Sequence, residues 1–227
     1  MTIFASAWHY GLNVIHGEDQ CADFSDKRSV MTLSRLLLTS LLLCPLMACA
    51  HNFIVGEQMA PLTISERGEL VLDKDNIRYR PWSSPQLAGK VRVLQYIAGR
   101  TSAKDKNALL IKAIKRAQFP DKQFQPTTIV NTDDEIPGSG FFVGRKVEKN
   151  KRKYPWAQFI IDSQGLGRKT WHLKPASSTI LLLDKDGHIQ WAKDGALTEQ
   201  EVCQLLHSVH DLLKPSRAQP APLPATP

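Results

Sequence analysis

The sequence predicts an α/β fold: a mixed central sheet flanked by helices, with an N-terminal β-hairpin extension. Three observations predict it. Strand-like runs alternate with amphipathic helical stretches between residues 69 and 213. A tight Asp-Gly turn, at residues 184–187, separates two apolar runs late in the chain. A capped helix that begins after Thr198 ends the pattern.

The first half of the pattern starts with a hairpin. Residues 69–73 and 77–80 flank turn-forming residues 74–76, and residues 91–97 form the next expected strand. One helix is expected over residues 102–117, because Leu110 and Ile114 share an apolar stripe with two alanines. Ser102 and Asp105 resemble a capping box at its start.

The second half adds strands at residues 127–131 and 156–161, and then the clearest hairpin, with residues 180–183 and 188–191 around the Asp-Gly turn. Thr198 and Glu201 form the capping pattern of a last helix, which must end before Pro215.

The chain is expected to contain one folded domain between two terminal segments. The 227 residues are enough for one good core, which we place at residues 51–214. Residues 215–227 are rich in Pro and Ala and are expected to be a disordered tail. Residues 1–30 show no clear period, and we expect a mis-assigned start or a disordered leader. The net charge of +7 permits nucleic acid, lipid or acidic ligands and does not choose among them.

Residues 31–50 have the pattern of a secretory signal peptide. A short basic start is followed by an apolar run at residues 36–47 and by small residues before His51. The run is too short to span a bilayer, which needs about 20 residues. We expect cleavage between Ala50 and His51 and export of the mature chain. The alternative is a lipoprotein signal, in which Cys49 would be lipidated and would anchor the protein to the membrane.

Removal of residues 1–50 would leave Cys203 as the single cysteine. An internal disulfide and a cysteine metal cluster are then excluded, and we expect neither a metal nor another cofactor. Cys203 supports one alternative, a single-cysteine peroxidase-like or thiol-transfer enzyme. That reading requires an accessible thiol of low pKa.

The order of elements resembles the thioredoxin-like fold over residues 54–213. The lead-in at residues 56–61, the Leu-x-Gly-Lys pattern at residues 87–90 and the closing segment at residues 181–202 carry the resemblance. It implies that the two cysteines of a Cys-x-x-Cys motif fall on Thr101 and Lys104, and that the cis-proline position falls on Ser178. Dithiol oxidoreductase activity is therefore not expected, and enzymatic activity of another kind stays uncertain.

Longer strings are similar to the YtfJ family, secreted thioredoxin-like proteins of Gram-negative bacteria. These strings are residues 89–95, 97–104, 128–134, 136–140, 154–156, 183–187 and 191–197. The resemblance implies periplasmic residence and the fold, but no reaction. Secretion argues against nucleic acid as a partner.

Two surfaces are candidates for binding. The first is the expected helix start, where Arg100, Thr101, Ser102 and Lys104 could hold a small anionic ligand or contact a periplasmic protein. The alternative is a capped loop without a ligand. We expect a non-redox binding or partner-interaction module that uses this surface.

The second surface is a basic run that could make peripheral contact with an anionic cell-envelope component. Its members are Arg145, Lys146, Lys149, Lys151, Arg152 and Lys153. The alternative for this run is a solvated loop. The acidic residues 131–135 also follow a strand, where sites often form, but they lack the ligand spacing of a calcium loop and are expected to form a solvated loop.

Overall fold

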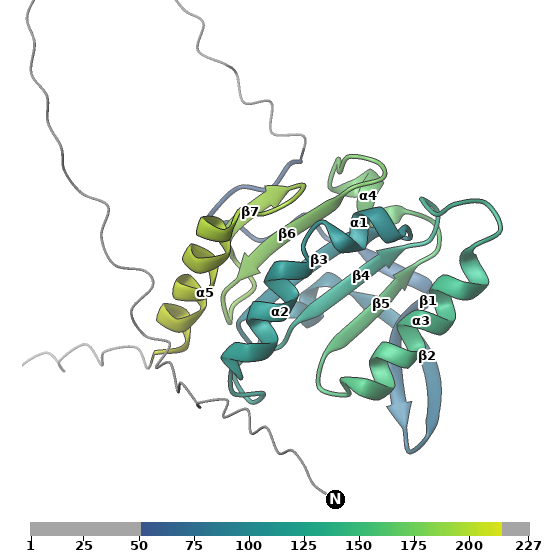
Figure 1. Cartoon of the computed structure of the whole chain (residues 1–227), viewed down its shortest axis with the longest axis horizontal. Coiled ribbons are helices and arrows are strands. Elements are labelled where there is room, and N and C mark those ends of the chain that lie inside the picture. Colours follow the sequence, from purple (N-terminus) through teal and green to yellow (C-terminus); the bar gives the residue numbers. More distant parts are fainter. Residues whose placement is uncertain (1–50, 215–227) are drawn as a thin grey trace, which may run out of the picture. The chain divides into compact units, whose positions relative to one another are not determined.

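The computed structural model describes residues 51–214, and the predictions for residues 1–50 and 215–227 lie outside this range. Seven strands form one sheet in the order β2-β1-β5-β4-β3-β6-β7 (Figure 1). The strands are β1 (Thr63–Asp73), β2 (Asn76–Ser83), β3 (Arg92–Ala98), β4 (Thr127–Asn131), β5 (Gln158–Asp162), β6 (Ser178–Leu183) and β7 (Ile189–Asp194).

The sheet is mixed, as predicted. Strands β3, β4 and β5 are parallel neighbours at its centre. On one side β6 and β7 continue it antiparallel, and on the other side β1 and β2 do so. Because the three central strands run in the same direction, the segments that follow them emerge at one edge of the sheet, which we call the carboxyl edge. It comprises residues 99–105, 131–140 and 162–170.

The N-terminal hairpin extends the sheet beyond β5. Its register shifts between Ile64 and Glu69, and at this irregularity Arg67 and Gly68 have positive φ values of 60° and 67°. Gly68 pairs there with Ile161 of β5. A Cβ on Gly68 would stand 2.3 Å from the carbonyl oxygen of Arg80, so the close approach of the two hairpin strands requires glycine.

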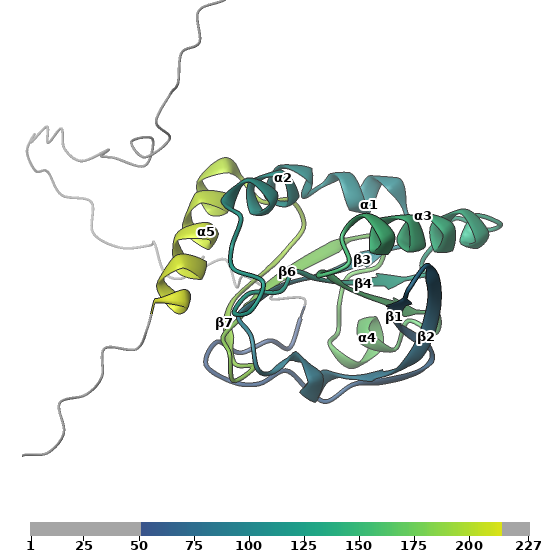
Figure 2. The ribbon, with the colours of Figure 1, turned by 90° about the horizontal axis from the view of Figure 1, so that it is seen from below.

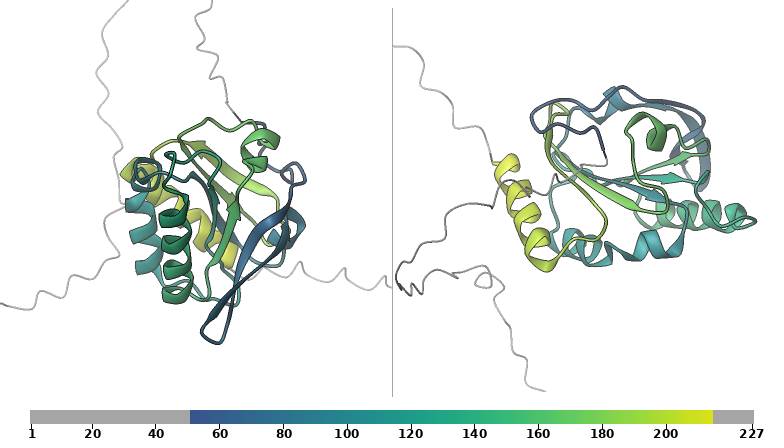
Figure 3. Two further views of the ribbon diagram at one scale, coloured as in Figure 1. Left: turned by 90° about the vertical axis from the view of Figure 1, so that its right-hand side faces the viewer. Right: turned by 90° about the horizontal axis from the view of Figure 1, so that it is seen from above.

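Helices cover both faces of the sheet (Figures 2 and 3). On one face lie α1 (Thr101–Asp105), α2 (Ala108–Ala117), α3 (Gly140–Lys153) and α5 (Glu199–Leu213). On the other lie α4 (Leu166–Thr170) and the N-terminal stretch, with the 3-10 turn η1 (Ser84–Leu87). Alternate residues of β3 serve the two cores: Val93 packs with α2 and α5, whereas Leu94 packs with Trp171.

The single helix predicted over residues 102–117 is wrong, because the structure has two helices. Asn107 separates α1 from α2 with φ −117° and ψ 29°. Its side chain is buried and bonds to Gly195 and Leu197, far along the chain. The predicted capping box of Ser102 and Asp105 is also wrong: Arg100 precedes α1, and no side chain caps the helix.

Two helices were not predicted at all. The basic run at residues 145–153 belongs to α3, so its interpretation as a solvated loop is wrong. Only Gly144, Val147 and Lys151 of this helix are buried, which explains the weak apolar signal in its sequence. The short helix α4 is capped from a distance by Asp162, whose carboxylate accepts hydrogen bonds from the backbone of Leu166 and Gly167.

The last helix confirms its prediction. Thr198 and Glu201 form a reciprocal capping box, and Val202, Leu205 and Val209 face the core. The hairpin of β6 and β7 around the Asp-Gly turn is also confirmed. None of the helices within residues 51–214 is long and apolar enough to cross a bilayer.

Candidate functional site at the carboxyl edge

The loop after β3 lies tightly against the loop after β4. The amide of Gly99 donates to the carbonyl oxygen of Asn131 at 2.8 Å. A Cβ on Gly99 would stand 3.1 Å from that oxygen and 3.1 Å from the Cβ of Glu135, so glycine permits the contact. The two loops therefore form one continuous surface beside the start of α1.

Arg100, the first predicted ligand residue, is held by Asp134. Its Nη2 lies 3.0 Å from Asp134 Oδ1, and its Nε donates to the Asp134 carbonyl oxygen at 3.0 Å. The second carboxylate oxygen of Asp134 accepts from the backbone of Ala176. Arg100 and Asp134 thus connect the segments that precede α1, α3 and β6.

The other residues predicted with Arg100 occupy the short helix α1. Thr101 and Ser102 are exposed, and the Nζ of Lys104 lies 3.1 Å from the Oδ1 of Asp105. Lys104 also lowers the pKa of Lys146 on α3 by charge repulsion, so the two ammonium groups are neighbours. The structure brings Arg100 and Lys104 to the same edge, and it adds one residue of the basic run to them.

A second group of polar residues joins the ends of β4 and β5. The amide of Asp133 donates to the Asn131 Oδ1, and Arg168 Nη2 of α4 lies 3.6 Å from Asp133 Oδ2. A Cβ on Gly165 would stand 2.7 Å from Asp133 Oδ2 and 3.3 Å from Asn131 Oδ1. The side chains of Asn131 and Asp133 therefore lie directly over the glycine that precedes α4.

Unpartnered buried polar atoms concentrate at this edge. Within residues 51–214, five buried side-chain nitrogen or oxygen atoms have no hydrogen-bond partner. Four of them lie here: Asn131 Nδ2, Glu135 Oε2, Ser163 Oγ and Arg168 Nε. Asn131 is 0% exposed. A buried polar group without a partner is costly, so such a concentration is typical of a site that a ligand or water completes.

A buried hydrogen-bond network joins Asp162, Tyr96 and the start of α4 at the carboxyl edge. The Asp162 carboxylate is fully buried and accepts from the Tyr96 hydroxyl at 2.9 Å, besides its two bonds to the α4 backbone. The same hydroxyl accepts from the amide of Arg168. Burial and the neighbouring Asp162 charge raise the pKa of Tyr96, so the phenol stays protonated as a donor.

Ser178, at the position where the thioredoxin pattern has a proline, is fully buried and hydrogen-bonded. Its Oγ accepts from Gln95 Nε2 and from Asn107 Nδ2, each at 3.1 Å. The described residues contain no cis peptide bond. At the position of this proline the chain instead places a hydroxyl group that accepts hydrogen bonds from two side-chain amides.

Cys203 lies on α5 and its residue is exposed. The accessibility that a thiol enzyme needs is therefore met, but its setting is a helix surface, outside the carboxyl edge. His207, one turn later, has its Nε2 3.4 Å from Asp211 Oδ2. This histidine is thus close to a carboxylate on its own helix.

The basic run forms most of the exposed side of α3. Arg145, Lys146, Lys149, Arg152 and Lys153 are exposed. Lys151 differs, because it is buried and its Nζ donates to the carbonyl oxygens of Pro155 and Ala157, both at 2.9 Å. Burial lowers the pKa of Lys151. Its contribution is structural, since it closes the turn into β5.

Two other features lie away from the edge. In the β6–β7 turn, ligand atoms of Asp184, Asp186 and His188 lie within 4.8 Å of one another. Both Asp184 oxygens already accept hydrogen bonds from the turn and from Gln190, and Lys185 lies 2.9 Å from Asp186. Turn formation accounts for this group.

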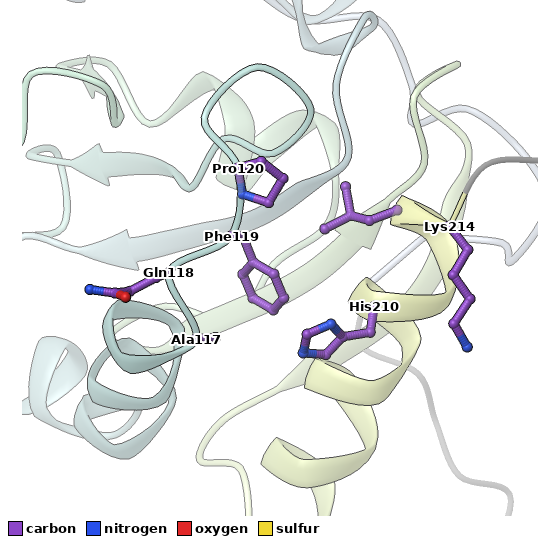
Figure 4. A pocket seen from close by; sticks show the side chains of 7 residues that line it. Ala117, Gln118, Phe119, Pro120, His210 and Lys214 are labelled. Atoms are coloured by element: carbon purple, nitrogen blue, oxygen red, sulfur yellow. The ribbon is translucent and has the colours of Figure 1, made fainter. Parts of the chain in front are cut away.

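The other feature is a shallow cavity of about 460 Å³ between the ends of α2 and α5 (Figure 4). Phe119 and His210 line it side by side and contact each other edge to face, with ring centroids 4.9 Å apart. It lies at the end of α2 that is remote from α1, and no unpartnered buried polar atom lines it. Its lining gives it no clear specificity for a polar ligand.

Sequence comparison assigns the family. The model of a bacterial family of unknown function, YtfJ_HI0045, matches residues 53–212. The chain belongs to the YtfJ family. It is 58% identical over 184 residues to the uncharacterized protein YtfJ of Escherichia coli strain K12, covering 81% of this chain and all of that protein. An uncharacterized protein of Haemophilus influenzae is 37% identical over 165 residues, covering 73% of this chain and 90% of the relative.

Solved structures show the fold of this YtfJ family member. A proposed protein disulfide isomerase from Bacteroides thetaiotaomicron superposes with a TM-score of 0.50 at 18% identity, covering 73% of this chain and 93% of that one. A thioredoxin-like superfamily protein matches with a TM-score of 0.47 at 15% identity, covering 70% of this chain and 97% of that one. The first of these two superpositions confirms the predicted thioredoxin-like fold. At this identity the likeness concerns the fold alone.

Proposed function

We propose that this YtfJ family member is a periplasmic binding module that uses the carboxyl edge of a thioredoxin-like fold without thiol exchange. The concentration of buried, unpartnered polar atoms at this edge carries the proposal. The signal-like pattern of residues 31–50 supports the location. The absence of cysteine from residues 99–105, 131–140 and 162–170 supports binding over redox chemistry.

The unpartnered atoms define the ligand's chemistry. Asn131 Nδ2 and Arg168 Nε are donors, Glu135 Oε2 is an acceptor, and Ser163 Oγ can be either. A matching ligand needs acceptors for two donors and a donor for the carboxylate. Since Arg100 and Arg168 already face Asp134 and Asp133, the edge does not favour a multiply charged anion. A small anion that also carries a donor fits best, such as an amino acid or a hydroxy acid.

Thermal stability tests this proposal, because a ligand that binds only the folded state raises the unfolding temperature. The probes are serine, threonine, lactate and glycerate, added separately to the full chain. At least one is expected to raise the unfolding temperature. Arg168→Gln and Asn131→Asp should remove that shift, since each removes a required donor.

The matched control is Lys169→Gln, which changes the same charge on the neighbouring α4 residue. Lys169 donates to the carbonyl oxygen of Gln164, within its own loop. The control should keep the ligand-induced shift. Absence of a shift with every probe, or a shift that survives both edge substitutions, would contradict binding at this edge.

A further inference from the structure

The exposed side of α3 has an unusual composition. Seven residues of this helix are exposed, and every one is either basic or phenylalanine: Phe141, Phe142, Arg145, Lys146, Lys149, Arg152 and Lys153. At 100° per residue they fall within one continuous arc of about 140°. Glu148, the single acid of the helix, lies outside this arc and accepts from the Tyr79 hydroxyl at 2.8 Å. We call these seven residues the α3 ridge.

The two phenylalanines are not explained by folding. Phe141 is 65% exposed and Phe142 is 70% exposed, so neither contributes much to a core. Their rings contact each other, with centroids 5.8 Å apart, and Arg145 lies 4.6 Å from the Phe141 ring centroid. Ile136, just before the helix, is also 57% exposed. These three apolar side chains are therefore exposed to solvent, close to the cations of the ridge.

Helix electrostatics explain only part of the charge. Cations in the last turn interact favourably with the helix dipole, which accounts for Arg152 and Lys153. Arg145 and Lys146 lie in the first half of the helix, where the dipole disfavours them. Lys104 of α1 adds further positive charge beside Lys146 and lowers its pKa. Positive charge is therefore also present at the end of the ridge that carries the phenylalanines, where helix electrostatics do not favour it.

We propose that the α3 ridge docks the domain on an anionic phospholipid surface. The five cations match lipid phosphates, and the phenylalanine pair matches the boundary between headgroups and acyl chains. An acidic soluble partner would match the cations but would leave two adjacent phenylalanines unexplained. Because α3 follows residues 131–139 directly, docking would also bring the carboxyl edge close to the membrane.

Sedimentation with vesicles tests this inference. The probes are vesicles of phosphatidylcholine alone and vesicles that also contain phosphatidylglycerol, mixed with the full chain at low and high salt. All variants keep residues 1–50, so any affinity of the apolar run is common to them. Binding should require phosphatidylglycerol and should weaken with salt.

Two sets of substitutions separate charge from insertion. Lys146→Glu, Lys149→Glu and Lys153→Glu together should weaken binding by about a hundredfold or more, from about fivefold per lysine at an anionic surface. The matched control reverses the same number of exposed lysines elsewhere: Lys122→Glu, Lys169→Glu and Lys174→Glu. The pair Phe141→Ser and Phe142→Ser should weaken binding by about tenfold at constant charge.

Thermal unfolding of each variant, compared with the unchanged chain, checks that the variant is folded. The phenylalanine pair provides a second test of binding that does not depend on charge reversal. Absence of binding at low salt would overturn the inference. An equal loss of vesicle binding in the control variant would also overturn it, because the net charge of the protein would then explain the binding without the ridge. Ridge-dependent binding to soluble polyglutamate without binding to vesicles would assign the ridge to an acidic polymer and refute the lipid.

Discussion

Asn107 donates from its side-chain nitrogen to the hydroxyl of Ser178 at 3.1 Å and so connects the start of α2 to the start of β6. The same nitrogen donates to the Gly195 carbonyl oxygen at 2.9 Å, and its oxygen accepts from the Leu197 amide at 3.0 Å. One buried amide therefore satisfies three groups from two distant segments beside the carboxyl edge.

Asn107→Ala should lower the free energy of unfolding by about 2–3 kcal/mol, because it leaves buried backbone and hydroxyl groups without partners. Urea unfolding measures this loss. Lys106→Ala, at the neighbouring exposed position, is the control and should change stability by less than about 0.5 kcal/mol. Equal effects of the two substitutions would show that the network contributes little.

Alanine substitutions at Gly68 and Gly56 separate two effects on the free energy of unfolding. One is the steric clash of an added Cβ, and the other is the strain of a side chain at positive φ. Both glycines have positive φ, but a Cβ on Gly68 would collide with the Arg80 carbonyl oxygen, whereas a Cβ on Gly56 meets nothing within 4 Å. Gly56→Ala should cost about 1 kcal/mol and Gly68→Ala distinctly more, at least about 2 kcal/mol. Urea unfolding of both variants tests the difference. Similar losses would contradict the account of the hairpin irregularity.

Arg100 and Asp134 should be energetically coupled. Arg100 is partly exposed and Asp134 is mostly buried, so solvent screens the pair only in part. A double-mutant cycle with Arg100→Gln and Asp134→Asn should give a coupling free energy of about 1 kcal/mol. Additive effects would mean that the contact does not hold the edge together, and would leave Arg100 available for a ligand.

The capping box of α5 makes stability depend on acid pH. A hydrogen bond from Lys193, and then bonds from Thr198, lower the pKa of Glu201 from 4.5 to about 2. A lowered folded-state pKa stabilises the protein above the unfolded value of 4.5, and this stabilisation disappears as the pH falls from about 4.5 to about 2.

Glu201→Gln should therefore reduce the difference in urea midpoint between pH 7 and pH 3. Glu199→Gln, two residues earlier on the same helix, is the control, because Glu199 takes no part in the capping box. Its pH dependence should match that of the unchanged chain. If Glu199→Gln had the larger effect, the box would not be the source of the acid sensitivity.

Local patterns in the sequence predicted the elements that carry local signals. The turn at Asp184–Gly187 and the box of Thr198 and Glu201 are formed by neighbours in the chain, and both are present. The break at Asn107 could not be predicted, because its partners lie about 90 residues later. Helix α3 was missed since its buried side is only a few residues wide.

The candidate site was only partly accessible to sequence reasoning. Arg100 and its neighbours were found because they follow a strand and precede a helix. Asn131 was noted only within the acidic run at residues 131–135, and Ser163 and Arg168 were not found, since the parallel arrangement of β4 and β5 is what brings the segments after these two strands together. The signal that could have found Ser163 and Arg168 is their position directly after a central strand, which residues 131–135 share.

The insulin-reduction assay tests most directly the claim that this thioredoxin-like domain binds without exchanging thiols. The full chain and its Cys203→Ser variant are compared at the same concentration of dithiothreitol. The account predicts that both give the uncatalysed rate of insulin precipitation. Robust turnover by the full chain that disappears in Cys203→Ser would contradict the account and would establish Cys203 as a catalytic thiol.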